Sequence, residues 1–142
     1  MSRYRLASYV GTVSKMMATE TATSVLVVDD EPQVVWMLQL SLEAEGYRTF
    51  TARDGAAALA EIEAHHPALM LLDVMMPVMD GWSVLERLQA IPASRRPRVV
   101  VVSARASLRD RAKATELGAD AFVPKPFNVD ELVETLRRLE QA

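Results

Sequence analysis

The sequence contains no cysteine, which excludes disulfide bonds and metal sites built on thiolates. No apolar run approaches the ~20 residues that a membrane-spanning helix needs, and polar residues interrupt the start of the chain where a signal peptide would be apolar. A basic excess is also missing, because the net charge is −3. We therefore expect a cytoplasmic protein that binds neither nucleic acid nor membrane through this chain.

The length and composition fit one folded domain. The chain has 142 residues, and half of them are apolar, which is enough for a single sizeable core. Residues 1–22 show no clean hydrophobic period and end in a Thr- and Ala-rich stretch. We predict a flexible N-terminal extension over 1–22 and the folded domain over 23–142. A short helix within the extension is the competing interpretation.

From residue 24 onward the pattern alternates between strand and helix. Most of the strands are continuous apolar or β-branched runs, which is typical of strands covered by helices on both faces. The first helix carries an apolar face of Val34, Met37, Leu38 and Leu42 at helical spacing, which we expect to face the core. Five such units indicate an α/β fold with a parallel sheet. The predicted strands are 24–28, 47–52, 68–72, 98–102 and 120–123, and the predicted helices are about 32–46, 54–64, 82–90, 107–117 and 128–142.

Chemically active side chains follow four of the predicted strands. Asp29 and Asp30 follow the first strand, Asp73 the third, Ser103 the fourth and Lys125 the fifth. An Asp after a strand is often only a helix N-cap, but capping does not explain all five residues together. In parallel α/β sheets, ligands bind at the carboxyl ends of the strands. Carboxylates there suit Mg²⁺, and one of them can act as a nucleophile toward phosphorus.

Four motifs make the sequence resemble a known family. They are residues 27–32 (VVDDEP), residues 71–77 (LLDVMMP) with Asp80 and Gly81, the pair Ser103 and Ala104, and residues 123–127 (VPKPF). Residues 24–142 thus resemble the receiver domain of two-component response regulators, of the single-domain type found in chemotaxis regulators. The resemblance implies a flavodoxin-like (βα)5 doubly wound fold with strand order 2-1-3-4-5.

The resemblance also implies roles for the acidic residues. Asp73 would be the phosphoacceptor. Asp30 and Asp73 would bind Mg²⁺ directly, Asp29 would act mostly through water, and the backbone carbonyl of Met75 would be a further ligand. The domain would catalyse its own phosphorylation and slow dephosphorylation, and it would not be a metabolic enzyme.

The remaining site residues would respond to the phosphoryl group. By the same resemblance, Ser103 would contact it and move, and Lys125 would bridge to it, with a cis bond between Lys125 and Pro126. Phe122 occupies the position of the switch aromatic, where a hydroxyl-bearing ring is common. The switch would then work by packing, without a phenolic hydrogen bond.

Partners follow from the same resemblance and from one surface feature. A sensor histidine kinase or a histidine phosphotransfer protein would supply the phosphoryl group, and a downstream effector would read the result. Val35, Trp36 and Leu40 lie off the predicted core face of the first helix, so we expect them to contact the phosphodonor; an uninvolved surface tryptophan is the alternative. A homodimer could form through the surface of the fourth helix, fifth strand and fifth helix. The sequence is compatible with a stand-alone receiver and with part of a longer regulator.

Three rival functions share parts of this pattern. A phosphatase of the haloacid dehalogenase type needs an Asp-x-Asp pattern after the first strand, whereas this chain has Asp29-Asp30-Glu31. A flavodoxin needs a phosphate-binding loop rich in Thr, Ser and Gly there, and an acidic pair would repel the flavin phosphate. A degenerate receiver that binds proteins independently of phosphorylation remains the alternative.

Overall fold

The computed structural model describes residues 22–76 and 79–141. Within them the chain alternates strands and helices, with one 3-10 turn, η2 (Ala93–Arg95), before the fourth strand. The extension predicted over residues 1–22 lies outside this description apart from Ala22. No helix in the described part is long and apolar enough to cross a membrane. The strands are β1 (Ser24–Val28), β2 (Arg48–Ala52), β3 (Leu69–Asp73), β4 (Arg98–Ser103) and β5 (Ala121–Pro124), and the helices are α2 (Pro32–Ala44), α3 (Gly55–His65), α4 (Gly81–Leu88), α5 (Leu108–Glu116) and α6 (Val129–Gln141).

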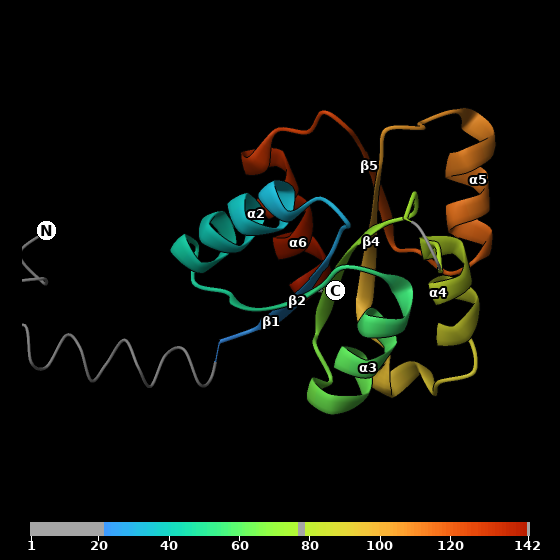
Figure 1. Cartoon of the computed structure of the whole chain (residues 1–142), viewed down its shortest axis with the longest axis horizontal. Helices are drawn as coiled ribbons and strands as arrows, with labels where there is room; N and C mark the ends of the chain where they lie inside the picture. The colour runs from blue at the N-terminus through green and yellow to red at the C-terminus, as the bar shows by residue number, and fades with distance from the viewer. Residues whose placement is uncertain (1–21, 77–78, 142) are drawn as a thin grey trace, which may run out of the picture.

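The five strands form one parallel sheet in the order β2-β1-β3-β4-β5. This confirms the predicted flavodoxin-like fold and its strand order. Helices α2 and α6 cover one face of the sheet, and α3, α4 and α5 cover the other (Figure 1). Because all strands are parallel, their carboxyl ends share one edge of the sheet.

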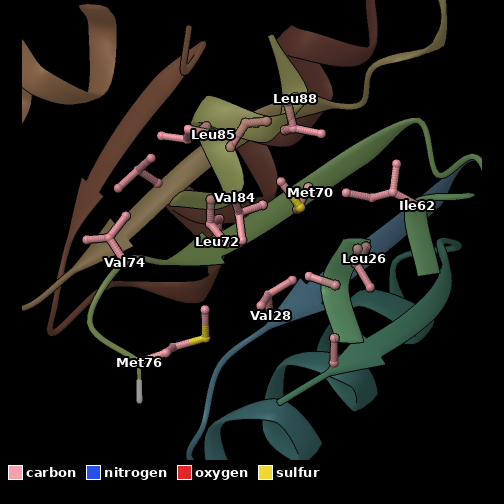
Figure 2. Packing of buried hydrophobic residues seen from close by; sticks show 14 of the residues in the cluster. Leu26, Val28, Ile62, Met70, Leu72, Val74, Met76, Val84, Leu85 and Leu88 are labelled. Carbon is pink, nitrogen blue, oxygen red and sulfur yellow. The ribbon is translucent and has the colours of Figure 1, made fainter. Parts of the chain in front are cut away.

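Each face of the sheet builds its own core. Leu26, Met70 and Leu72 point to the first core cluster, which includes buried residues of α3 and α4 (Figure 2). The neighbouring residues Val27 and Leu71 point the other way, into the second core cluster with buried residues of α2 and α6. This alternation follows from the two-residue period of a strand. It explains why the central strands read as continuous apolar runs.

The start of helix α4 packs closely against the residues that follow β3. The Asp80 carboxylate accepts a hydrogen bond from the Ser83 N–H at 2.9 Å and so caps the helix. The Gly81 N–H donates to the Val74 carbonyl at 3.2 Å. A Cβ on Gly81 would lie only 2.6 Å from the Val74 Cα, so only glycine permits this approach. The contact fixes the course of the chain immediately after Asp73.

The structure corrects two expectations. Met37, predicted to face the core, is instead 37% exposed. Around the helix axis its side chain points in a direction between that of the buried Leu38 and that of the exposed Trp36. Val35, predicted on the outer face, is half-buried and packs against the second core cluster. The 3-10 turn η2 was not predicted, because three residues leave no periodic signal.

Candidate functional site

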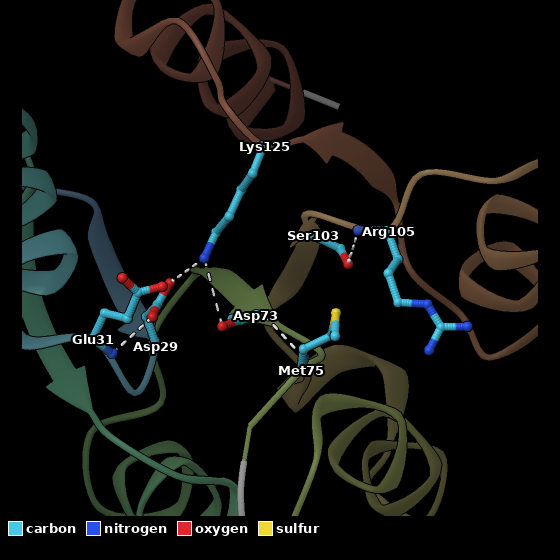
Figure 3. Close-up of polar contacts among 7 residues, drawn as sticks. All are labelled: Asp29, Glu31, Asp73, Met75, Ser103, Arg105 and Lys125. Carbon is cyan, nitrogen blue, oxygen red and sulfur yellow. Dashed lines mark hydrogen bonds and ion pairs between the residues drawn. The ribbon is translucent and has the colours of Figure 1, made fainter.

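Four strand ends bring the predicted site residues to one place. Asp29 follows β1, Asp73 ends β3, Ser103 ends β4 and Lys125 follows β5. The sheet register pairs Val28 with Leu72, and Ser103 with Pro124. Asp29, Asp73, Ser103 and Lys125 accordingly lie around a common space (Figure 3).

Lys125 lies between two buried carboxylates. Its Nζ donates to Asp29 Oδ2 at 2.8 Å and lies 3.6 Å from Asp73 Oδ2. Burial works to lower the pKa of Lys125, but the hydrogen bond and charge of Asp29, with the charges of Asp73 and Glu31, outweigh it and raise the pKa. The amine is therefore held as an ammonium beside Asp73.

Asp73 is a buried carboxylate with a fixed orientation. Its side chain is almost fully shielded from solvent, and Oδ1 accepts a hydrogen bond from the Met75 N–H at 2.9 Å. Burial raises the pKa of Asp73, and the Met75 N–H and the Lys125 ammonium offset this only in part, while Asp29 and Asp30 add to the rise. A carboxylate held in this way keeps Oδ2 directed toward Lys125.

An acidic cluster after β1 consists of Asp29, Asp30 and Glu31, of which Glu31 was not predicted. Carboxylate oxygens of Asp29, Asp30 and Glu31 all lie within 4.8 Å of one another. Asp29 is buried, its Oδ1 accepts from the Glu31 N–H at 2.9 Å, and Asp30 and Glu31 are more open to solvent. Such a group of hard oxygen donors fits Mg²⁺. The motif assigned Asp29 and Asp30 but not Glu31, although the unbroken acidic run after β1 was a signal for it.

Ser103 connects the site to helix α5. Its side chain is fully buried, and its Oγ accepts from the Arg105 N–H at 3.1 Å. The Arg105 Nε lies 3.9 Å from Asp110 in the first turn of α5. Ser103 is thus linked through Arg105 to the first turn of that helix.

The other predicted residues also lie near this edge. The Lys125–Pro126 bond is cis. Phe122 is half-buried on β5, and the Arg111 guanidinium of α5 lies 4.8 Å from the centre of its ring. The Met75 side chain is 49% exposed. The contact between Arg111 and Phe122 was not predicted from the sequence.

Comparison with known proteins identifies the family to which the chain belongs. The sequence model of the response regulator receiver domain matches residues 25–137, which include all the residues described above. The chain belongs to the response regulator receiver family.

Individual relatives agree with the family assignment. The transcriptional regulatory proteins KdpE and PrrA of Mycobacterium tuberculosis are each 41% identical to the receiver domain, over 115 and 119 residues. The alignments cover 81% and 84% of this chain and 50% of each relative. The chain thus spans about half the length of these curated relatives.

Solved structures show the same fold. A CheY-like response regulator receiver domain protein from Methanospirillum hungatei superimposes with a TM-score of 0.78 at 30% identity, covering 84% of this chain and 95% of that one. Chemotaxis protein CheY4 of Vibrio cholerae gives a TM-score of 0.78 at 29% identity, with 83% and 98% covered.

Proposed function

We propose that this receiver domain is a phosphorylation-dependent switch that accepts a phosphoryl group on Asp73 from a phosphohistidine of a kinase or phosphotransfer protein. The observation that carries the proposal is the placement of Asp73: a buried carboxylate, 3.6 Å from a lysine ammonium, beside an acidic cluster that fits Mg²⁺. We place this activity in the cytoplasm.

The proposed transfer uses the described groups as follows. An Asp73 oxygen attacks phosphorus, the new O–P bond forms as the N–P bond of phosphohistidine breaks, and the imidazole nitrogen leaves. Lys125 neutralises one phosphoryl oxygen as a point charge, and the Ser103 hydroxyl donates to another. Mg²⁺ bound by Asp30, Asp73 and the Met75 carbonyl, and through water by Asp29, would neutralise negative charge during transfer.

The new phosphoryl group then changes the surface. It adds charge and hydrogen-bond acceptors that draw Ser103 and Lys125 toward Asp73. The Arg105 N–H loses its bond to Ser103 when the hydroxyl turns, which shifts the balance between two arrangements of α5 and Phe122. The surface of α5, β5 and α6 then binds an effector or a second copy of the chain.

The test is the intact mass after incubation with a small acyl-phosphate donor, with and without Mg²⁺. We expect one phosphoryl adduct that needs Mg²⁺ and is absent from Asp73→Asn. If a folded protein gives no adduct under any condition, the degenerate receiver acting as a phosphorylation-independent binding module is the better description.

Helix α2 presents the surface proposed to meet the phosphodonor. Trp36 is 65% exposed and Leu40 50% exposed, with the exposed Met37 beside them and Val35 at the inner margin. Solvent-exposed apolar side chains in a row favour a helical partner. The row begins about one turn after the acidic cluster, on the helix that directly follows Asp29, Asp30 and Glu31.

Trp36→Ala is expected to slow transfer from the cognate phosphodonor and to weaken its binding by about tenfold. Phosphorylation by the small acyl-phosphate donor is the control and should not change, because Trp36 contacts none of the reacting groups. An unchanged rate and affinity with the cognate partner would leave Trp36 as an uninvolved surface residue.

A further inference from the structure

The edge of the sheet opposite the acidic site carries a basic hollow. Its volume is about 320 Å³, and it is lined by His66, Pro67, Ala68, Ser94, Arg95 and Arg96. In Figure 1 the end of α3 and the turn before β4 lie at the bottom of the sheet, away from the loop between β4 and α5. The hollow is therefore separate from the phosphorylation site.

The polar side chains that line the hollow can all donate hydrogen bonds, and none of them is a carboxylate. None of the six lining residues is acidic, although the whole chain has a net charge of −3. Within residues 22–76 and 79–141, the side chains of His66, Ser94 and Arg95 make no hydrogen bond, ion pair or ring contact. The two guanidinium groups therefore have no counter-ion among the residues that line the hollow.

One hydrogen bond and several prolines restrict the chain around these groups. The Arg96 Nε donates to the Ile91 carbonyl at 2.6 Å, which anchors the guanidinium and leaves its terminal nitrogens for other acceptors. Pro67 and Pro97 are buried beside the hollow, and Pro92 precedes η2. Because proline fixes φ, the arginines lose little backbone freedom when an anion binds.

From this arrangement we propose that the hollow is a binding site for a small phosphate-bearing anion. Arginine presents paired N–H donors that match two oxygens of a phosphate, and two arginines can hold adjacent phosphates of one molecule. The Ser94 hydroxyl and a His66 ring nitrogen supply further donors. A volume of about 320 Å³ is at the lower end of the range for small-molecule sites. The proposal does not depend on phosphorylation of Asp73.

The test is an amide NMR titration of the whole chain with pyrophosphate, in EDTA and at constant ionic strength. We expect saturable shifts of the amides of residues 66, 68 and 94–96, and none at Asp29 or Asp73. Arg95→Gln should weaken binding by about tenfold, whereas Arg109→Gln, which makes the same charge change on the exposed surface of α5, should not. Ser94→Ala is a second variant that keeps all charges and should weaken binding to a smaller extent.

Two further titrations identify the chemical class of the ligand. ADP binding more tightly than pyrophosphate would assign a nucleotide, and the reverse order would assign an inorganic phosphate; both results support the site. Acetate at the same ionic strength should give no saturable shift. The proposal is overturned if acetate shifts the same amides to the same extent, if the pyrophosphate shifts never saturate, or if Arg95→Gln and Arg109→Gln bind alike.

Discussion

At the scale of single residues, the charge of the Lys125 ammonium is set against the carboxylates of Asp29 and Asp73, with those of Asp30 and Glu31 close to Asp29. Lys125 Nζ is 2.8 Å from Asp29 but 3.6 Å from Asp73, so its contact with Asp29 is the closer one. Carboxylate oxygens of Asp30, Asp29 and Glu31 lie within 4.8 Å of one another, and Asp30 forms no ion pair of its own among the described residues. Repulsion in this cluster opposes folding when no divalent cation is bound.

Asp30→Asn should therefore raise the free energy of unfolding in EDTA by roughly 0.5–1 kcal/mol. Mg²⁺ should stabilise the parent protein and should stabilise the variant much less, because a ligand has been lost. Urea unfolding with and without Mg²⁺ measures both effects. Glu63→Gln, an exposed acid on α3, is the matched control, and an equal gain from that change would attribute the effect to net charge alone.

Tyr47 titrates at the other end of the molecule. Burial first, and then the hydrogen bond and charge of Glu140, raise its pKa from 10.0 to about 12, and its hydroxyl donates to Glu140 Oε2 at 3.1 Å. The neutral phenol is thus favoured more in the folded chain than in the unfolded chain. This contribution to stability is complete below pH 10 and is lost as the pH rises toward 12.

Tyr47→Phe should remove that pH dependence. Between pH 10 and 12 the parent protein should lose stability faster than Tyr47→Phe, so the difference between their free energies of unfolding should shrink or reverse across this window. Denaturation at pH 9, 10 and 11 measures it. Parallel curves for the two proteins would contradict the raised pKa.

At the scale of elements, α5 is held differently from the other helices. Ala114 is its only buried residue, so little apolar area attaches it to the sheet. Side-chain contacts with the segment around α4 add to this attachment. Lys113 Nζ lies 4.7 Å from the ring centre of Trp82 on α4, and Gln89 Nε2 donates to the Leu117 carbonyl at 2.7 Å. A helix fastened in this way can move at a small cost in free energy.

Trp82→Ala should loosen α5 without unfolding the domain. Losing a cation–π contact worth about 1 kcal/mol should speed hydrogen exchange of the α5 amides about fivefold. Trp36→Ala, the other tryptophan in the chain, should leave those amides unchanged. Lys113→Met should reproduce the effect and Lys113→Arg should not, since arginine keeps the cation; equal protection in all variants would show that the contact does not hold the helix.

At the scale of the whole molecule, one sheet joins two cores. Leu71 and Leu72 are adjacent on β3 and buried, yet they face the second and the first core cluster respectively. Because both clusters share the central strands, neither can lose its packing without disturbing the sheet. The domain is therefore expected to unfold as one cooperative unit.

Leu71→Ala and Leu72→Ala should each lower the free energy of unfolding by about 2–5 kcal/mol. Urea transitions followed by far-UV circular dichroism and by tryptophan fluorescence should coincide in both variants. Leu108→Ala is the control, because that side chain is 87% exposed and should change stability by less than ~0.5 kcal/mol. Separate transitions in either core variant would show that the clusters unfold independently.

The elements of the fold and the position of the acidic site could be predicted from the sequence alone. Apolar runs and helical spacing are local properties, so they predicted the strands and α-helices of residues 22–76 and 79–141 to within about two residues. Parallel strands share their carboxyl ends at one edge, so the order of elements along the chain was enough to assign the acids after β1 and β3 to one site. The motifs at those ends indicated the same family as the comparisons with known proteins.

Only the tertiary structure decided how the side chains pair. It placed Lys125 nearer to Asp29 than to Asp73, added Glu31 to the acidic cluster and exposed Met37. It also formed contacts between residues far apart in the chain, including Trp82 with Lys113 and Tyr47 with Glu140. Such contacts depend on side-chain direction and on how helices pack across the sheet, and a local pattern carries neither.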